Sequence, residues 1–270
     1  MNYTKDELIA EIERRAPWYQ SIDFPMHGVS ATDNVANALI DAAWDNKTDF
    51  ISLEEAARLR PKPKYQLFKE FIPKAEGLDV LEIGCNCGFF SFEFANMGAR
   101  TVTGIDVSPK WLDNASWAKK VLGHENVRFY NCDFMRFDAG DKPAQGLFSK
   151  RDKQVPLPDA LYDMVFMSTV LDHMFFPLFS IYKMCRISRK WVIIDIPCAD
   201  TAAAGEAIAR LSVPPDKSHH GFSFSIGFLR TFINRLGIAF DDIAVHEYKE
   251  GRSAIFVIDV SRMADGLIGA

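Results

Sequence analysis

The stretch VLEIGCNCG, residues 80–88, decides the fold class of this chain. Its apolar start is typical of a buried strand, and the FFSFEFANMG that follows, residues 89–98, is typical of a helix closed by glycine. Between them stand an acid, Glu82, and two glycines four positions apart, Gly84 and Gly88. Glycine lets a backbone pass close to a ligand where a Cβ would clash. The stretch therefore predicts a ligand loop at the carboxyl edge of an α/β sheet, with a tight turn that binds nothing as the alternative.

Strand-like and helix-like runs alternate outward from this loop. TVTGID, NVRFYNCD, LYDMVFM and KWVIIDIP are expected to be strands, with helical stretches between them. Such alternation predicts βαβ units and a Rossmann-like, doubly wound parallel sheet. The final runs IAVHEY and SAIFVIDV, joined by Lys249-Glu250-Gly251, predict a closing antiparallel pair. We expect residues 1–75 to form an N-terminal helical extension and 76–270 the α/β domain, with an insertion at about 138–160 and a lid at about 199–224.

Composition excludes several other classes of protein. Apolar residues make up 48% of the 270 and charged residues 25%, as in a globular protein that needs no disulfide or metal for its stability. The formal net charge of −5 disfavours general binding to nucleic acid or membrane surfaces. The charged N-terminus predicts no signal peptide, and no run of about 18 apolar residues predicts a membrane span. Five irregularly spaced cysteines predict reduced thiols in a cytoplasmic protein, and we expect no metal site.

Polar side chains stand where the later strands are expected to end. Asp106 closes the second strand, where an acid can accept both hydrogen bonds of a ribose diol. Asp133 closes the third strand, where a carboxylate can accept from an adenine amino group. Ser168 and Asp172 follow the fourth. Each acid alone also fits a helix N-cap, but acids on consecutive strand ends favour a nucleoside site.

Residues 78–196 resemble a class I S-adenosylmethionine-dependent methyltransferase. The resemblance implies a seven-stranded sheet, S-adenosyl-L-methionine as cofactor and S-adenosyl-L-homocysteine as product. It also implies that the glycine loop cradles the methionine part, Asp106 the ribose and Asp133 the adenine. A nicotinamide-dependent dehydrogenase competes on this fold, but its G-x-G-x-x-G fingerprint is broken here at Asn86 and Phe89. The cofactor-binding residues expected are Glu82, Gly84, Cys85, Asn86, Gly88, Asp106, Val107, Asp133, Phe134 and Ser168.

More of the chain is similar to a narrower subfamily, the tRNA wobble-uridine (mo5U34) methyltransferase-like proteins. The similar features are WYQSIDFP at residues 18–25, Gly28, Lys64 and VFMSTVLDHM at residues 165–174. Members that transfer carboxymethyl carry a tyrosine directly before the motif's histidine, where this chain has Asp172. An acid would repel a second carboxylate, so ordinary S-adenosylmethionine is expected.

Candidates for the chemistry lie near the same edge. His173 is the first candidate base because its ordinary pKa suits proton transfer near neutrality, and Asp172 and His220 are the others. Each has an alternative, a helix cap or a solvated turn. Phenylalanine clusters are mostly core at such spacing, yet those beside the active edge would suit an apolar or aromatic acceptor. The substrate-binding residues expected are Trp18, Tyr19, Lys64, Phe176, His219 and Phe222.

The sequence thus predicts methylation of a small-molecule metabolite and no membrane partner, and leaves the oligomeric state open. The first alternative is tRNA modification, which needs a basic surface. A second is a nucleoside-binding regulator that catalyses nothing. The residues available for a basic surface are Arg58, Arg60, Lys62, Lys64, Lys150, Arg151 and Lys153.

Overall fold

The computed structural model describes residues 3–31, 61–136, 162–198, 207–212, 221–248 and 253–263. The insertion expected at 138–160 and much of the expected lid lie outside the described residues. In the described part, no helix is both long and apolar enough to cross a bilayer.

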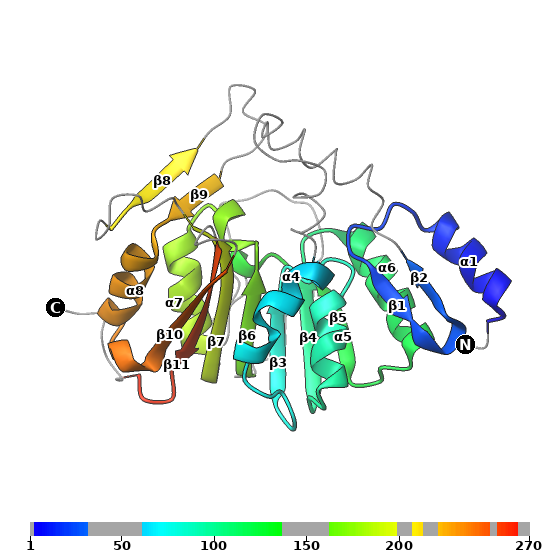
Figure 1. Cartoon of the computed structure of the whole chain (residues 1–270), viewed down its shortest axis with the longest axis horizontal. Helices are drawn as coiled ribbons and strands as arrows, with labels where there is room; N and C mark the ends of the chain where they lie inside the picture. Colours follow the sequence, from blue (N-terminus) through cyan, green and yellow to red (C-terminus); the bar gives the residue numbers. More distant parts are fainter. Residues whose placement is uncertain are drawn as a thin grey trace.

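A seven-stranded sheet forms the centre of the molecule, in the order β10-β11-β7-β6-β3-β4-β5 (Figure 1). Its inner pairs are parallel, and β11 runs antiparallel to both β7 and β10. This confirms the predicted doubly wound sheet and its antiparallel last strand. The strands are β3 (Asp79–Ile83), β4 (Thr101–Asp106), β5 (Val127–Asn131), β6 (Tyr162–Ser168), β7 (Ser188–Pro197), β10 (Ile243–Tyr248) and β11 (Ser253–Asp259).

Helices cover both faces of the sheet, because alternate side chains of a strand point to opposite sides. Leu81 and Ile83 of β3 pack into a buried cluster with residues of α7 (Pro177–Ile187) and α8 (Ile226–Arg235). Val80 of the same strand belongs to a second cluster, with residues of α5 (Phe89–Asn96), α6 (Pro109–Leu122) and α4 (Pro61–Phe68). Short 3-10 turns η2 (Lys69–Phe71), η3 (Phe134–Arg136) and η5 (Phe240–Asp242) fill connections.

One helix boundary differs from the expectation in a way that matters for the site. The run HMFFPLFSIYKMCRIS, 173–188, was expected to be helical throughout, but α7 begins only at Pro177. Proline disfavours helical backbone at the residue before it, and Phe176 is accordingly not helical, with φ −126° and ψ 66°. His173 therefore lies in a separate 3-10 turn, η4 (Leu171–His173), directly after β6.

The N-terminal extension is only partly helical. Thr4 and Glu7 form a capping box at the start of α1 (Lys5–Arg14). The next residues form a two-stranded hairpin, β1 (Ile22–Phe24) and β2 (Val29–Ala31), around the short turn η1 (Pro25–His27). The aromatic WYQSIDFP stretch thus contributes a strand to the extension. The hairpin and α1 lie beside α6 (Figure 1).

Candidate functional site

The glycine loop between β3 and α5 adopts left-handed backbone at three positions. The φ angles are 73° at Gly84, 51° at Asn86 and 91° at Gly88. A Cβ on Gly84 would stand 2.4 Å from Val170 Cγ2, and one on Gly88 would stand 2.8 Å from Phe129 Cζ. Asn86 tolerates the conformation because asparagine enters the left-handed region more readily than most residues, and its Oδ1 accepts from Cys87 N at 2.8 Å. The two glycines therefore let this loop, which we call the glycine cradle, pack closely against Val170 and Phe129.

Asp106, at the end of β4, is joined to this loop. Its Oδ2 accepts from Asn86 N at 2.9 Å and its Oδ1 from Ser108 N at 2.8 Å. Burial raises the pKa of the carboxyl, although the backbone N–H groups of Ser108, Asn86 and Val107 oppose that shift. Each oxygen keeps lone pairs for further donors, as a ribose diol would require. The neighbouring Val107 is 68% exposed and presents an apolar side chain at the same edge.

Glu82 and Cys85 lie beneath the loop. The Glu82 carboxyl is buried and accepts from the hydroxyl of Ser91. Burial raises its pKa to about 8, so the group is mostly protonated at neutral pH. Cys85 is fully buried, and burial raises the pKa of its thiol. Both residues therefore support the loop from within.

The end of β5 supplies a further polar group. Asp133 accepts from Met135 N at 2.9 Å, which is the capping interaction considered as its alternative role. Phe134 is buried, and its carbonyl oxygen accepts from Lys183 Nζ at 2.8 Å. Capping is therefore the role that the structure shows for Asp133, at the sheet edge where an adenine-binding acid was expected.

The tip of β6 carries a polar cluster that the sequence did not reveal. Lys64, only 4% exposed, donates to Ser168 Oγ at 2.7 Å and to Thr169, and lies 2.6 Å from Asp195 Oδ2. Ser168 donates to the same carboxylate at 2.6 Å, and Tyr248 donates to its other oxygen. Lys64 was expected to hold a substrate anion or to be solvated. The structure instead buries it against a carboxylate of β7.

Asp172 and His173 stand together in η4, just beyond this cluster. His173 Nε2 lies 3.5 Å from Asp172 Oδ2, and the side chains are 53% and 15% exposed respectively. A carboxylate can orient a histidine for proton transfer, so the pair has the composition of a base and its partner. His219 and His220 lie outside the described residues.

Trp18 and Tyr19 were expected to contact substrate, but each packs on α6. Trp18 is buried, donates to Ile12 O at 3.0 Å and lies 5.9 Å from the Trp117 ring. Tyr19 lies 5.8 Å from the Trp111 ring. The neighbouring Gln20 was not predicted: its buried Oε1 accepts from Phe89 N at 3.0 Å, at the first residue of α5. The extension therefore contacts the end of the glycine loop through Gln20.

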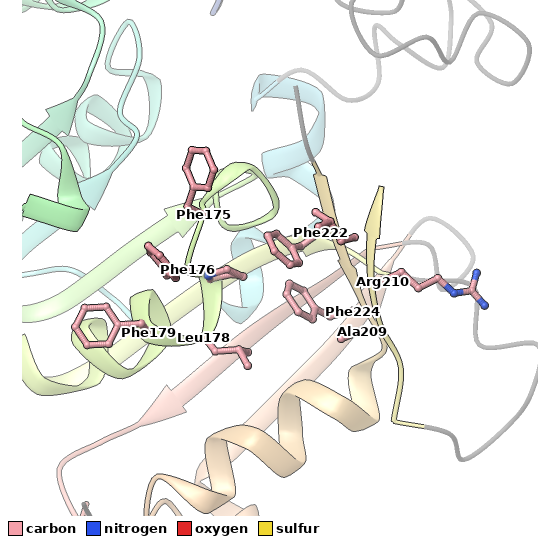
Figure 2. Close-up of a pocket in the computed structure, with 10 residues that line it drawn as sticks. Phe175, Phe176, Leu178, Phe179, Ala209, Arg210, Phe222 and Phe224 are labelled. Carbon is pink, nitrogen blue, oxygen red and sulfur yellow. The ribbon is translucent and has the colours of Figure 1, made fainter. Parts of the chain in front are cut away.

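An apolar groove of about 410 Å³ lies between the β6–α7 connection and the hairpin of β8 (Ala209–Ser212) and β9 (Gly221–Phe224). Figure 2 shows Phe222 and Phe224 on the side of the hairpin that faces the β6–α7 connection, while the Arg210 side chain extends away from it. Phe175 and Phe176 are 72% and 59% exposed. The lining residues are Phe175, Phe176, Pro177, Leu178, Phe179, Ala209, Arg210, Leu211, Phe222 and Phe224.

Metal chemistry has no visible support in the described ranges, which contain no group of three or more His, Cys, Asp or Glu side chains that could hold an ion. All five cysteines are described and free, and four of them are buried.

A family model described as a methyltransferase domain matches residues 74–210, half of the chain. The tRNA U34 carboxymethyltransferase of Nautilia profundicola is 31% identical over 80 residues, which cover 26% of this chain and 26% of that protein. The enzyme of the same name from Shewanella frigidimarina is 26% identical over 121 residues, 45% of this chain and 29% of that protein. The matched stretches thus span less than a third of each curated relative.

A solved structure matches nearly the whole chain. The N-terminal domain of EvdMO1 with S-adenosylhomocysteine (SAH) bound superimposes with a TM-score of 0.61 at 15% identity, covering 95% of this chain and 96% of that one. The same domain in the presence of SAH and D-fucose gives a TM-score of 0.59 at 14% identity. At this identity the likeness establishes the fold.

Proposed function

Because this chain belongs to the family of class I S-adenosylmethionine-dependent methyltransferases, we propose that it transfers a methyl group from S-adenosylmethionine to a small-molecule acceptor. One observation carries the proposal. The segment that follows β6 adjoins two features. Its Val170 packs against the glycine cradle, which is hydrogen-bonded to the Asp106 carboxylate, and its Phe175 lines the apolar, aromatic groove.

The residues of the cradle fit the cofactor. Gly84 and Gly88 let the loop backbone pack closely against Val170 and Phe129, Asp106 is the proposed acceptor for the ribose of the cofactor, and Asp133 is the proposed contact of its adenine. When bound, the cofactor supplies a methyl group that its sulfonium has already activated. The protein must therefore mainly align the acceptor, exclude water and, for a hydroxyl or carbon acceptor, remove a proton.

The groove suits an apolar or aromatic acceptor. Exposed phenylalanines are costly in water, and a flat apolar molecule would cover Phe175, Phe176 and Phe222. His173, oriented by Asp172, is the proposed base. The EvdMO1 domain, solved in the presence of a sugar, is in line with a small molecule as acceptor.

Modification of tRNA is the second candidate, because both curated relatives are tRNA U34 carboxymethyltransferases. Two of the basic residues required for it are described. Lys62 lies 2.5 Å from Asp23 Oδ2, and Lys64 is buried against Asp195. Neither supports a phosphate-binding surface, whereas the other five lie outside the described residues. A regulator that binds the nucleoside without turnover is the third candidate.

The test combines mass spectrometry with labelled methyl transfer. Native and denaturing spectra of the purified protein identify any co-purified nucleoside, and calorimetry measures the affinity for added S-adenosylmethionine. Tritiated cofactor is then offered with the low-mass fraction of a cell extract and, separately, with bulk tRNA. We expect cofactor binding and label in the low-mass fraction. Label in tRNA alone would select the second candidate, binding without transfer the third, and no binding would overturn all three.

A further inference from the structure

A buried ion pair lies at the tip of β6, and the proposed chemistry does not use it. The side chains of Lys64 and Asp195 are 5% and 1% exposed. Removing two charges from water is expensive, and apolar residues of similar volume often stabilise a fold as well or better. Three further hydroxyls, from Ser168, Thr169 and Tyr248, are directed into the pair. Such a cluster calls for an account beyond stability.

The hydrogen bonds of the cluster can be traced atom by atom. The three donors of the Lys64 ammonium go to Asp195, Ser168 and Thr169. Ser168 Oγ donates a hydrogen bond to Asp195 Oδ2 at 2.6 Å. Thr169 Oγ1 has only Ser168 Oγ nearby as a recipient for its proton among the described residues, at 3.4 Å, which is long for a hydroxyl bond. An acceptor at normal hydrogen-bond distance would therefore take the hydrogen bond that the Thr169 hydroxyl can donate.

The backbone of Thr169 has an unusual conformation. Its φ is 53°, in the left-handed region that a β-branched residue rarely adopts. Thr169 is an exposed residue, although Lys64, which donates to its hydroxyl, is buried. Thr169 N also donates to Asp195 O at 2.8 Å, and the next residue, Val170, packs against Gly84 of the cofactor loop. Backbone strain of this kind is characteristic of functional sites.

The geometry points to Thr169 as a hydrogen-bond donor to the methyl acceptor, with Lys64 and Asp195 as the positioning pair that polarises and holds it. This inference rests on the proposed function, since the ligand is the acceptor of the transferred methyl. The β6–α7 connection continues from Thr169 to Phe175 and Phe176 of the groove, and β9 packs against η4 of that connection. The proposed acceptor extends from the phenylalanines of the groove to Thr169, whose neighbour Val170 packs against Gly84.

Charge selects the group that Thr169 binds. Lys64 and Asp195 neutralise one another, and the carboxylates of Asp106 and Asp172 lie at the same edge. A carboxylate on the ligand would meet this negative field, while a neutral oxygen would not. We therefore assign the site to an aromatic molecule that carries an uncharged carbonyl oxygen.

The experiment uses two ligands of the same shape, benzamide and benzoate, on the full-length protein. Ligand-detected NMR titration measures both affinities, with and without SAH. We expect benzamide to bind in the millimolar range and more tightly than benzoate. Thr169→Val keeps the β-branched shape and removes only the hydroxyl, so it should weaken benzamide roughly three- to tenfold. Thr169→Ser, which restores the hydroxyl, should bind like the parent.

The role of Lys64 is tested through Thr169. The neutral pair Lys64→Met with Asp195→Asn should weaken benzamide as Thr169→Val does, and the triple variant should be no weaker than either. Additive losses would make the pair merely structural, and SAH binding verifies that each variant is folded. Absence of benzamide binding, a preference for benzoate, or an unchanged affinity in Thr169→Val would each overturn the inference. Since these ligands need no methyl transfer, failure here is separate from failure of the proposed function.

Discussion

Asn86 and Thr169 show two ways in which this protein holds a non-glycine residue in left-handed backbone. Asn86 uses its own side chain, whose oxygen accepts from the next residue's N–H, and Asp106 fixes its amide. Thr169 relies on distant groups, because its hydroxyl is bound by Lys64 from 105 positions away. Both conformations lie beside the cofactor loop, so single residues at this edge carry much of the site's geometry.

Replacing Asp106 by alanine should weaken cofactor binding by roughly 1–3 kcal/mol, the cost of losing charge-assisted hydrogen bonds. The Asn86 amide also loses its acceptor, so the loop should become less ordered. Calorimetric titration with SAH measures the effect. Asp113→Ala on α6, whose carboxylate is 74% exposed, is the control. An affinity equal to that of the control would remove the ribose assignment.

His173→Ala should leave SAH affinity unchanged and slow turnover about 10²–10⁴-fold, the usual contribution of a general base. Its reason is the position of His173 next to Asp172, directly after β6. Single-turnover transfer to the acceptor found with labelled cofactor measures the rate. His124→Ala, at the other end of α6 from the site, serves as the matched histidine control. Full activity of His173→Ala would show that the base is elsewhere or that none is needed.

Glu82 should make the free protein less stable as the pH rises from about 4.5 to about 8. Its pKa is raised by burial to about 8, so in this window the folded state holds a proton that the unfolded state has released. The free energy of unfolding from this group therefore falls with rising pH, by at most about 1.4 kcal/mol per pH unit. Urea denaturation at several pH values should show that Glu82→Gln removes this slope. A variant curve parallel to the parent would contradict the protonated assignment.

At the scale of elements, the glycine loop, α5 and the N-terminal extension form one unit. The first N–H groups of a helix have no partner within it. Gln20 supplies a partner for Phe89 N from outside the sheet domain. The extension also packs on α6, where the ring of Trp18 lies against the ring of Trp117. The start of α5 thus depends on a segment nearly 70 positions earlier in the chain.

Gln20→Met, which keeps the length of the side chain and loses the acceptor, should destabilise the protein by about 1–3 kcal/mol, because a buried N–H is left unsatisfied. It should also lower SAH affinity, since Phe89 follows Gly88 of the loop directly. Chemical denaturation and calorimetry measure the two effects. Arg14→Met, on the exposed end of α1, is the control. Loss of stability without any change in SAH affinity would confine Gln20 to a packing role.

Elements followed from local sequence more readily than the site did. Alternating apolar runs and glycine stops predicted β3, β4 and α6 because those signals lie within each segment. The Lys64 cluster joins α4, β6, β7 and β10, and no local sequence pattern predicts contacts between segments so far apart in the chain. Lys64 in particular was expected to contact substrate, because nothing near it in the sequence indicates its partner on β7.

At the scale of the whole molecule, the two edges of the sheet have different tasks. The carboxyl edge carries the cradle and the groove. The opposite edge is closed by an ion-pair network: Asp79 accepts from Arg100 at 2.9 and 2.5 Å, and Arg189 bridges Asp79 and Asp163 at 3.4 and 2.7 Å. This network joins three neighbouring strands away from the site.

Asp79→Asn should remove part of the stability that the protein loses in acid. Hydrogen bonds from Arg100 lower the pKa of Asp79 to about 2, so its contribution is complete above about pH 4 and disappears as the pH falls towards 2. Urea denaturation between pH 2 and pH 5 should give a shallower decline for the variant. Thr101→Val, which removes a weaker cause of the same lowered pKa, should reduce the slope less than Asp79→Asn does. Equal slopes for parent and Asp79→Asn would rule out this role.

The hydrogen bond from Phe89 to Gln20 also bears on how such domains can be recombined. A sheet domain grafted onto a different leader sequence would begin α5 with an orphaned amide beside the glycine loop. Unless the new leader supplied an acceptor at the same place, the glycine loop of the graft would be less well ordered. Leader and loop are therefore a pair to be exchanged together in any chimera.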